Sequence, residues 1–453
     1  MRHDEKSIML PIGRNFPAGA GPALQFRIAA MTGSTMVGRN VLFNLSLASL
    51  LLGLTAVCQA ENWPRFRGPD GLGLSEDESI PAKWTSEEVA WVTDLPGVGH
   101  SSPVIWGDAA FVTSATDEGK SRTLYCLDAV TGAIRWSKTE NYDTNKLHAK
   151  NSFATSSPAT DGERVYVPFA DDYNYSLSAY DYAGELVWKK SLGTYKSQHG
   201  LGVSPIVFED LVFMPNDQDG PSSVVAFDRR DGKVVWTAER EAREASYSTP
   251  IIVEQAGLRP QLVCVSGATG MSSLDPWTGE LNWKTAPLPQ RTVASPAKAG
   301  GLIFVTCGQG GKGTRLIGVD PGGQGDVEES HIKVRRDKGL PYVPTIIGYG
   351  DWIFFWNDNG VVSCVDVRTL ETHWEKRIGG NFSGSPIIVA GKLYCIDEAG
   401  QVVVIAASPD YKHLATNDLG DPSHSTPAVA NGRLYLRSFH KLTCVGPKPA
   451  VDQ

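Results

Sequence analysis

The sequence predicts an all-β fold: an eight-bladed β-propeller of four-stranded antiparallel blades, closed by an N-terminal strand. Three observations predict it. A hairpin motif that ends in tryptophan recurs along most of the chain. A proline, usually after serine or threonine, recurs eight times at intervals of 41 to 55 residues, a spacing typical of propeller blades. An isolated strand near the start also matches a strand that the last unit lacks.

The hairpin motif is clearest at residues 124–136. Aspartate and glycine favour a tight turn because they tolerate unusual backbone angles, and the tryptophan supplies a large apolar anchor at the end of the second strand. Each copy therefore forms the outer hairpin of a blade, and we expect its tryptophan to be buried between neighbouring blades. The motif positions are Asp128, Gly132, Trp136, Asp181, Trp188, Asp228, Gly232, Trp236, Asp275, Gly279, Trp283, Asp366 and Trp374.

The proline landmark marks the start of each blade. Proline suits the first position of a strand, where its missing N–H breaks no ladder. Short apolar runs separated by turns follow each proline and supply the other strands of the blade. The eight landmarks are Ser102-Pro103, Ser157-Pro158, Ser204-Pro205, Thr249-Pro250, Ser295-Pro296, Val343-Pro344, Ser385-Pro386 and Thr426-Pro427.

The motif resembles that of the PQQ-like eight-bladed propeller family, whose signature is Ala-x-Asp-x-x-x-Gly-x-x-x-Trp. The resemblance covers residues 89–445 and implies the propeller fold. Two blades depart from the signature, since Pro321-Gly322-Gly323 follows Asp320 without a tryptophan, and Ala406 stands where blade 7 should have its aspartate. In function the family includes both quinone-dependent dehydrogenases and scaffolding proteins, so the resemblance implies no single activity.

Composition excludes some classes of function. The chain has 453 residues, of which 41% are hydrophobic and 20% charged, as in an ordinary globular protein. Its net charge is −8 and no cluster of lysine and arginine stands out. Because phosphate binding needs a basic face, we expect no nucleic-acid partner.

The N-terminal region predicts export. Residues 1–35 form an unstructured extension or a mis-assigned start. Residues 36–60 have the order of a signal peptide: a positive Arg39, an apolar stretch over 41–57 and a cleavage site after Ala60. A permanent membrane anchor and a lipoprotein at Cys58 are the alternatives. We expect a periplasmic or secreted protein that meets the membrane only through this segment.

The remaining boundaries follow the repeat. Residues 61–88 form an N-terminal lid segment whose Trp63 and Arg65 we expect to be structural, with a binding role as the alternative. Residues 89–446 form the propeller and 447–453 a tail. Trp91 lies in an outer strand that would complete blade 8 and remove the last exposed sheet edge.

Six cysteines follow the predicted cleavage site, and each lies in a predicted strand. Packed sheets lie about 10 Å apart, too far for a disulfide. We therefore expect buried free thiols, with a staple between blades after export as the alternative. No Cys-x-x-Cys or paired histidine spacing predicts a metal site.

Candidate binding residues lie in the polar loops. Blade-to-blade connections and the second turn of each blade should meet around the axis, on one face. For each residue there, a plain solvent-exposed role is the alternative. Lys150, Asn151, Gln198 and Asp219 belong to the same loops. The candidates are His100, His148, Asp171, Asp172, His199, Asn216, Asp217, Gln309, Lys312, Asn357, Asp358 and His424.

Three classes of function remain open. The first is an exported, non-catalytic scaffold that resembles BamB, binds an envelope protein and acts as a monomer without a cofactor. The second is a module that binds a small ligand or polysaccharide. The third is a PQQ-dependent dehydrogenase with calcium. The resemblance implies that such an enzyme carries two adjacent cysteines and long insertions between strands, and this sequence has neither. We expect a non-catalytic protein and assign no catalytic or metal-binding residue.

Overall fold

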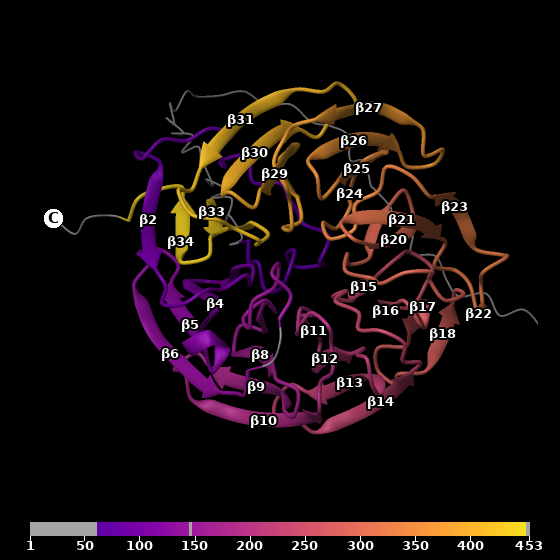
Figure 1. Cartoon of the computed structure of the whole chain (residues 1–453), viewed down its shortest axis with the longest axis horizontal. Coiled ribbons are helices and arrows are strands. Elements are labelled where there is room, and N and C mark those ends of the chain that lie inside the picture. Colours follow the sequence, from indigo (N-terminus) through magenta and orange to yellow (C-terminus); the bar gives the residue numbers. More distant parts are fainter. Residues whose placement is uncertain (1–60, 145–146, 450–453) are drawn as a thin grey trace, which may run out of the picture. The chain divides into compact units, whose positions relative to one another are not determined.

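The computed structural model describes residues 61–144 and 147–449, so the predicted extension, signal peptide and cleavage site lie outside the described residues. Within them the strands form eight sheets that follow one another around a common axis (Figure 1). In each blade the first of the four repeat strands begins just after a blade landmark, near the axis, and the other three follow antiparallel toward the rim. The fold is the predicted eight-bladed propeller with almost no helix.

The first four blades use consecutive strands. Blade 4 carries a fifth strand, β22, which pairs parallel with its outer strand, and one short 3-10 turn, η1 (Asp117–Gly119), lies in blade 1. Blade 1 consists of β3 (Val104–Trp106), β4 (Ala109–Thr116), β5 (Ser121–Asp128) and β6 (Ile134–Asn141), and blade 2 of β7 (Ala159–Thr160), β8 (Arg164–Ala170), β9 (Tyr175–Asp181) and β10 (Leu186–Gly193). Blade 3 consists of β11 (Ile206–Phe208), β12 (Leu211–Asn216), β13 (Ser222–Asp228) and β14 (Val234–Arg240). Blade 4 consists of β15 (Ile251–Val253), β16 (Gln261–Ser266), β17 (Gly270–Leu274), β18 (Leu281–Lys284) and β22 (Gly325–Asp326).

The last four blades include two strands from the N-terminal part of the chain. β1 adds to blade 7 in parallel with its inner strand, and β2 is the outer strand of blade 8. Blade 5 consists of β19 (Ala297–Ala299), β20 (Leu302–Gln309), β21 (Lys312–Val319) and β23 (Ile332–Arg336), and blade 6 of β24 (Ile347–Tyr349), β25 (Trp352–Trp356), β26 (Val361–Asp366) and β27 (Thr372–Arg377). Blade 7 consists of β1 (Leu74–Ser75), β28 (Ile387–Val389), β29 (Lys392–Ile396), β30 (Gln401–Ala406) and β31 (His413–Asp418). Blade 8 consists of β2 (Val89–Asp94), β32 (Ala428–Ala430), β33 (Arg433–Arg437) and β34 (Lys441–Val445).

A closed ring of hydrogen bonds joins the eight blades at the axis. Each blade contributes one serine or threonine at its start. The hydroxyl of this residue accepts the backbone N–H of the equivalent residue in the preceding blade, at 2.9–3.2 Å between nitrogen and oxygen. All eight residues are at most 4% exposed. The ring runs through Ser102, Ser157, Ser204, Thr249, Ser295, Thr345, Ser385 and Thr426 and back to Ser102.

The landmark of blade 6 is misplaced in the sequence analysis. The residues Val343-Pro344 precede the ring position, which Thr345 occupies, and Ile346 takes the place of the proline before β24. The proline at 344 is therefore not the equivalent of the other seven. The ring requires a hydroxyl at this point, because each hydroxyl accepts a buried N–H group that would otherwise lack a hydrogen-bond partner.

In six of the eight blades a motif tryptophan contacts the following blade. Trp188 donates its indole N–H to the Arg229 carbonyl at 3.0 Å, and Trp236 does the same to the Pro276 carbonyl at 3.0 Å. The turn glycine lies against the indole, since a Cβ on Gly232 would stand 2.6 Å from a Trp188 ring carbon. Each tryptophan thus fixes the following blade. Similar bonds are donated by Trp91, Trp136, Trp283 and Trp374.

The motif positions have structural roles in this arrangement. The carboxylates of Asp128, Asp181, Asp228, Asp275 and Asp366 accept backbone N–H groups of their own turns. The tryptophans at 188, 236, 283 and 374 are at most 9% exposed, whereas the one at 136 is half-buried. In blade 6, Leu370 stands at the glycine position with a φ of 60°, a backbone strain that glycine would avoid.

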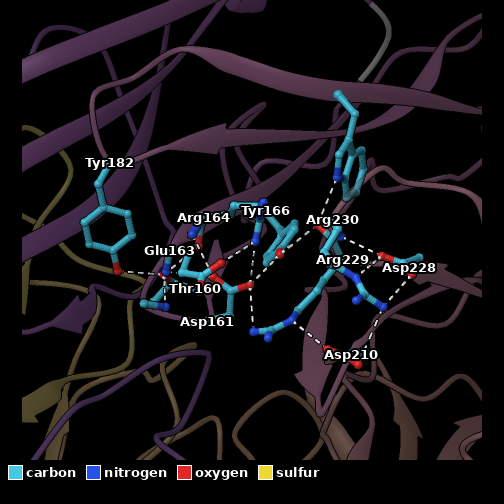
Figure 2. Close-up of polar contacts among 12 residues, drawn as sticks. Thr160, Asp161, Glu163, Arg164, Tyr166, Tyr182, Asp210, Asp228, Arg229 and Arg230 are labelled. Carbon is cyan, nitrogen blue, oxygen red and sulfur yellow. Dashed lines mark hydrogen bonds and ion pairs between the residues drawn. The ribbon is translucent and has the colours of Figure 1, made fainter.

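Polar contacts reinforce the same junctions on the face away from the ring hydroxyls. Between blades 2 and 3, the nearly buried Asp161 carboxylate accepts the Tyr166 hydroxyl at 2.8 Å and pairs with Arg229 at 3.3 Å (Figure 2). The same arginine reaches Asp210 of its own blade at 3.2 Å. The turn that carries Arg229 is thereby held by Asp161 of blade 2 and by Asp210 of blade 3, so this network is structural.

Two blades lack the motif tryptophan. Strand register places Val334 and Ala415 at the tryptophan position of blades 5 and 7. In blade 7 the N-terminal segment adds to the core, because the buried Ile80 belongs to the same hydrophobic cluster as Ala415. The Tyr394 hydroxyl anchors that segment by donating to the Ile80 and Pro81 carbonyls at 3.3 and 3.2 Å.

The N-terminal segment also crosses the end of the ring. Trp63 pairs with Ile105 of blade 1 and is fully buried. Arg65 donates to the Pro250 carbonyl of blade 4 at 2.9 Å, and Arg67 donates to the Pro386 carbonyl of blade 7 at 3.2 Å. Further along, β2 pairs antiparallel with β34, with Val89 opposite Val445. With bonds from Thr160 of blade 2 to the Pro64 carbonyl and from Arg67 to the Ile346 carbonyl of blade 6, the segment ties six blades together.

We expect Trp236→Ala to lower the free energy of unfolding by about 3 to 5 kcal/mol, because it empties a buried site and removes the contact with blade 4. Val235, 49% exposed beside it, is the matched control, and Val235→Ala should change stability by less than about 0.5 kcal/mol. Urea unfolding followed by circular dichroism measures both. Equal stability of the two variants would contradict the role given to the tryptophan.

Deleting residues 61–95 should expose the edge of β34 and produce an aggregation-prone protein, because an unpaired strand edge recruits other strands. Size-exclusion chromatography and thermal unfolding measure the effect. A soluble monomer that melts like the protein starting at residue 61 would show that the segment is dispensable.

Candidate functional site

The loop-rich end of the axis holds a cavity of about 620 Å³. All eight ring residues line it, together with side chains from the blade-to-blade connections and from several second turns. Phe66 of the N-terminal segment also reaches it. A cavity of this size lies within the range typical of small-ligand sites.

The cavity brings together half of the predicted candidates. Those that line it are His100, His148, His199, Gln309, Asp358 and His424. Those that do not line it are Asp171, Asp172, Asn216, Asp217, Lys312 and Asn357. Sequence position alone does not separate the candidates that line the cavity from the others on the same connections and turns.

Several of the outer candidates are held in internal contacts. Asp217 forms a buried ion pair with Arg240 at 2.7 Å, and the Asn216 side chain accepts a bond from Gln218. Asp171 accepts the backbone N–H groups of Asp143, Tyr173 and Asn174, which shapes its loop. The remaining members of this outer group are Asp172, an exposed neighbour of Asp171, Lys312 at the start of β21, and Asn357, whose backbone closes the second turn of blade 6.

One histidine pair lies where blades 8 and 1 meet. The rings of His100 and His424 have centroids 4.6 Å apart, and both contact Phe439, at 4.8 and 5.0 Å. Burial, with the nearby His424 and Arg437, holds the pKa of His100 well below its ordinary value. Burial also lowers the pKa of His424. Both imidazoles are therefore uncharged near neutral pH.

A second histidine pair lies in the neighbouring connections, before blades 2 and 3. The rings of His148 and His199 have centroids 4.5 Å apart. Arg291 donates to His199 Nε2 at 2.5 Å, and because a guanidinium only donates, His199 must accept and be neutral. Burial, then Arg291 and His148, lower the pKa of His199 to about 4.

The charged groups of the cavity already have partners. Lys150 pairs with Glu398 of blade 7 at 2.7 Å, and Arg291 pairs with Glu244 at 3.3 Å. The buried Asp358 carboxylate accepts the backbone N–H of Tyr342 at 2.8 Å, although burial still raises its pKa. The walls are therefore polar but close to charge balance.

Arg291, Glu244, Tyr247 and Tyr342 line the cavity but were missed in the sequence. A usable signal exists: the first three lie two to five residues before Thr249 or Ser295 in the chain, and His100, His199 and His424 bear the same relation to their own ring residues. The last few residues of each connection turn toward the axis before the ring. Counting back from the landmark would have found them.

Possible metal ligands do not cluster in the described residues. Within residues 61–144 and 147–449, no group of three or more His, Cys, Asp or Glu side chains could hold a metal ion. The cysteines of this part of the chain are free and buried in separate strands, at 126, 264, 307, 364, 395 and 444. Across the same residues, no helix has the length and apolar character needed to span a membrane.

The lowered pKa of His199 should make stability depend on pH. Its pKa is about 4 in the folded state and about 6.5 in the unfolded chain, so the unfolded state binds more protons between these values. Stability should therefore fall as pH falls from about 6.5 to about 4. Urea unfolding at several pH values should show a shallower fall for His199→Gln. The exposed His413, replaced in the same way, is the control, and equal slopes in all three proteins would contradict the assignment.

Comparisons with known proteins agree with this architecture. The polyvinylalcohol dehydrogenase of Pseudomonas sp is 26% identical over 195 residues, which are 40% of this chain and 28% of that protein. The chain thus matches less than a third of that relative's length.

Solved structures show the same fold. BamB from Moraxella catarrhalis aligns with a TM-score of 0.55 at 15% identity, over 80% of this chain and 100% of that one. Quinohemoprotein alcohol dehydrogenase from Comamonas testosteroni aligns with a TM-score of 0.61 at 13% identity, over 87% of this chain and 82% of that one. The family model described as outer membrane protein assembly factor BamB matches residues 82–322, more than half of the chain, so the chain belongs to that family.

Proposed function

We propose that the protein is an exported, non-catalytic propeller that acts as a monomer and binds a ligand through its loop-rich face. The observation that carries this proposal is the axial cavity, which all eight blades build from hydrogen-bonding side chains. Binding sites of this kind place a few polar groups around a preformed hollow. An envelope protein docking on the same face is the other partner that the BamB-like family supports.

The chemistry of the walls supports binding rather than catalysis. The carboxylates of Glu244 and Asp358 are held by Arg291 and by backbone N–H groups, so neither is placed as a free acid or base. The ring hydroxyls accept N–H bonds from neighbouring blades, and among the described residues no histidine forms a hydrogen bond with them. A nucleophile needs such a base within hydrogen-bond reach.

A quinone-dependent dehydrogenase is the second candidate, supported by the match to polyvinylalcohol dehydrogenase. The cavity residues do not fit a calcium–quinone site. Calcium prefers six to eight oxygen ligands, and both carboxylates of the cavity are already engaged. The free thiols also lie in separate strands, whereas the resemblance implies adjacent cysteines.

Export is part of the proposal. It is supported by the signal-like residues 36–60 and by the family's description as an outer membrane assembly factor. Fractionation of cells that express the full chain tests it, because the exported form should be shorter by about 60 residues if cleavage follows Ala60.

Native mass spectrometry tests the binding function. Protein starting at residue 61 is equilibrated with a small-molecule extract, and retained masses are compared with those of Val293→Trp. Val293 is a half-buried cavity residue, so the larger side chain should fill the hollow. We expect a retained mass in the parent protein that the variant lacks.

Addition of PQQ and Ca²⁺ to the same protein, with dye reduction by alcohols and sugars, tests the alternative. We expect neither stoichiometric uptake nor turnover. Uptake with turnover would replace the binding proposal with a dehydrogenase.

A further inference from the structure

The ring hydroxyls have an unused hydrogen-bonding capacity. Each hydroxyl can accept bonds and also donate one proton. All eight accept a backbone N–H, yet within the described part of the chain none donates to a protein acceptor. Because every ring residue lines the cavity, eight O–H donors surround its inner end.

Buried donors need acceptors. The ring residues are at most 4% exposed, so their hydroxyls are open only toward the cavity, and a buried hydroxyl without an acceptor costs free energy. A ligand with many oxygen atoms could accept several of these protons at once. This separates the ring from an ordinary polar surface, whose hydroxyls are solvated.

The charge of the walls argues against an ion as the ligand. Lys150 is neutralised by Glu398 and Arg291 by Glu244, while the remaining acid, Asp358, is held by amides. The His199 ring is neutral because it accepts from the arginine. A ligand of either sign would have to compete with these contacts.

The sides of the cavity carry flat rings. Tyr247 and Tyr342 line it beside the two histidine pairs, and Phe66 adds an apolar face. Side chains of this type combine an apolar body with a polar edge. They suit a ligand whose own faces are apolar and whose edges carry hydroxyl groups.

We propose that the axial cavity binds a neutral, polyhydroxylated ligand, a saccharide or polyol, whose oxygens accept the protons of the hydroxyl ring while its faces lie against the aromatic walls. This inference rests on the proposed binding function and names the ligand class for the same site.

Thermal shift and isothermal titration calorimetry test the ligand class. The neutral probes are glucose, galactose, maltose, cellobiose and sorbitol, and the charged probes are glucuronate and glucosamine. We expect saturable binding of at least one neutral probe and weaker binding of its charged counterpart. Val293→Trp should abolish the binding, whereas Val235→Trp at the exposed rim should keep it. The two variants also control for the general stabilisation that concentrated sugars give.

Ring variants test the role of the hydroxyls. Three members are threonines, and Thr249→Val, Thr345→Val and Thr426→Val keep the shape while removing the hydroxyl. Each should weaken binding of the neutral probe by about 3- to 10-fold, the usual effect of one lost hydrogen bond. Circular dichroism checks that each variant is folded. If a variant fails to fold, Val293→Trp still decides the location of the site.

Two outcomes would overturn the inference. If only charged probes bind, and Val293→Trp abolishes that binding, the ligand class is wrong although the binding function stands. If no probe binds while the extract experiment retains a mass, the ligand belongs to another class. Failure of both experiments would remove the binding function as well.

Discussion

The structure depends on a repeated hydrogen bond at the axis, from a backbone N–H of one blade to a hydroxyl of the next. A buried N–H without an acceptor is costly, and the eight inner strands meet where no sheet partner is available for these groups. Serine and threonine supply the acceptor without adding bulk. The same residues then lie at the inner end of the cavity, so the contact that holds the blades together also determines what the cavity offers to a ligand.

Much of the fold could be predicted because the repeat acts locally. The aspartate turn, the glycine and the tryptophan interact between adjacent blades, and their spacing along the chain reports that contact directly. Where the repeat was eroded, prediction failed for a physical reason. In blade 6 the proline at 344 was mistaken for the landmark, since the essential group is the hydroxyl of Thr345, not the ring of a proline. Likewise, nothing in the sequence of blade 7 indicates that the distant Ile80 joins its hydrophobic core.

The candidate site was harder to predict because it is assembled from separate blades. His148 and His199 could be assigned to the polar connections of the blades. However, the two rings come from connections about 50 residues apart, and the Arg291 that donates to His199 lies about 90 residues further along the chain. Asp217 and Asp358 are both acids near second turns, yet one forms an ion pair and the other faces the cavity. The residues packed around each carboxylate decide this, and they come from other parts of the chain.

The pairing of β2 with β34 has a consequence for how the chain folds. The eighth blade is complete only when Val89 pairs with Val445, which lies more than 350 residues later in the chain. Contacts of such long sequence separation slow folding, because a large loop must close before they form. Until the last strand is available, one sheet edge stays open and can recruit other chains. Blade 8 can therefore be completed only after β34, close to the C-terminal end of the described residues, has been synthesised.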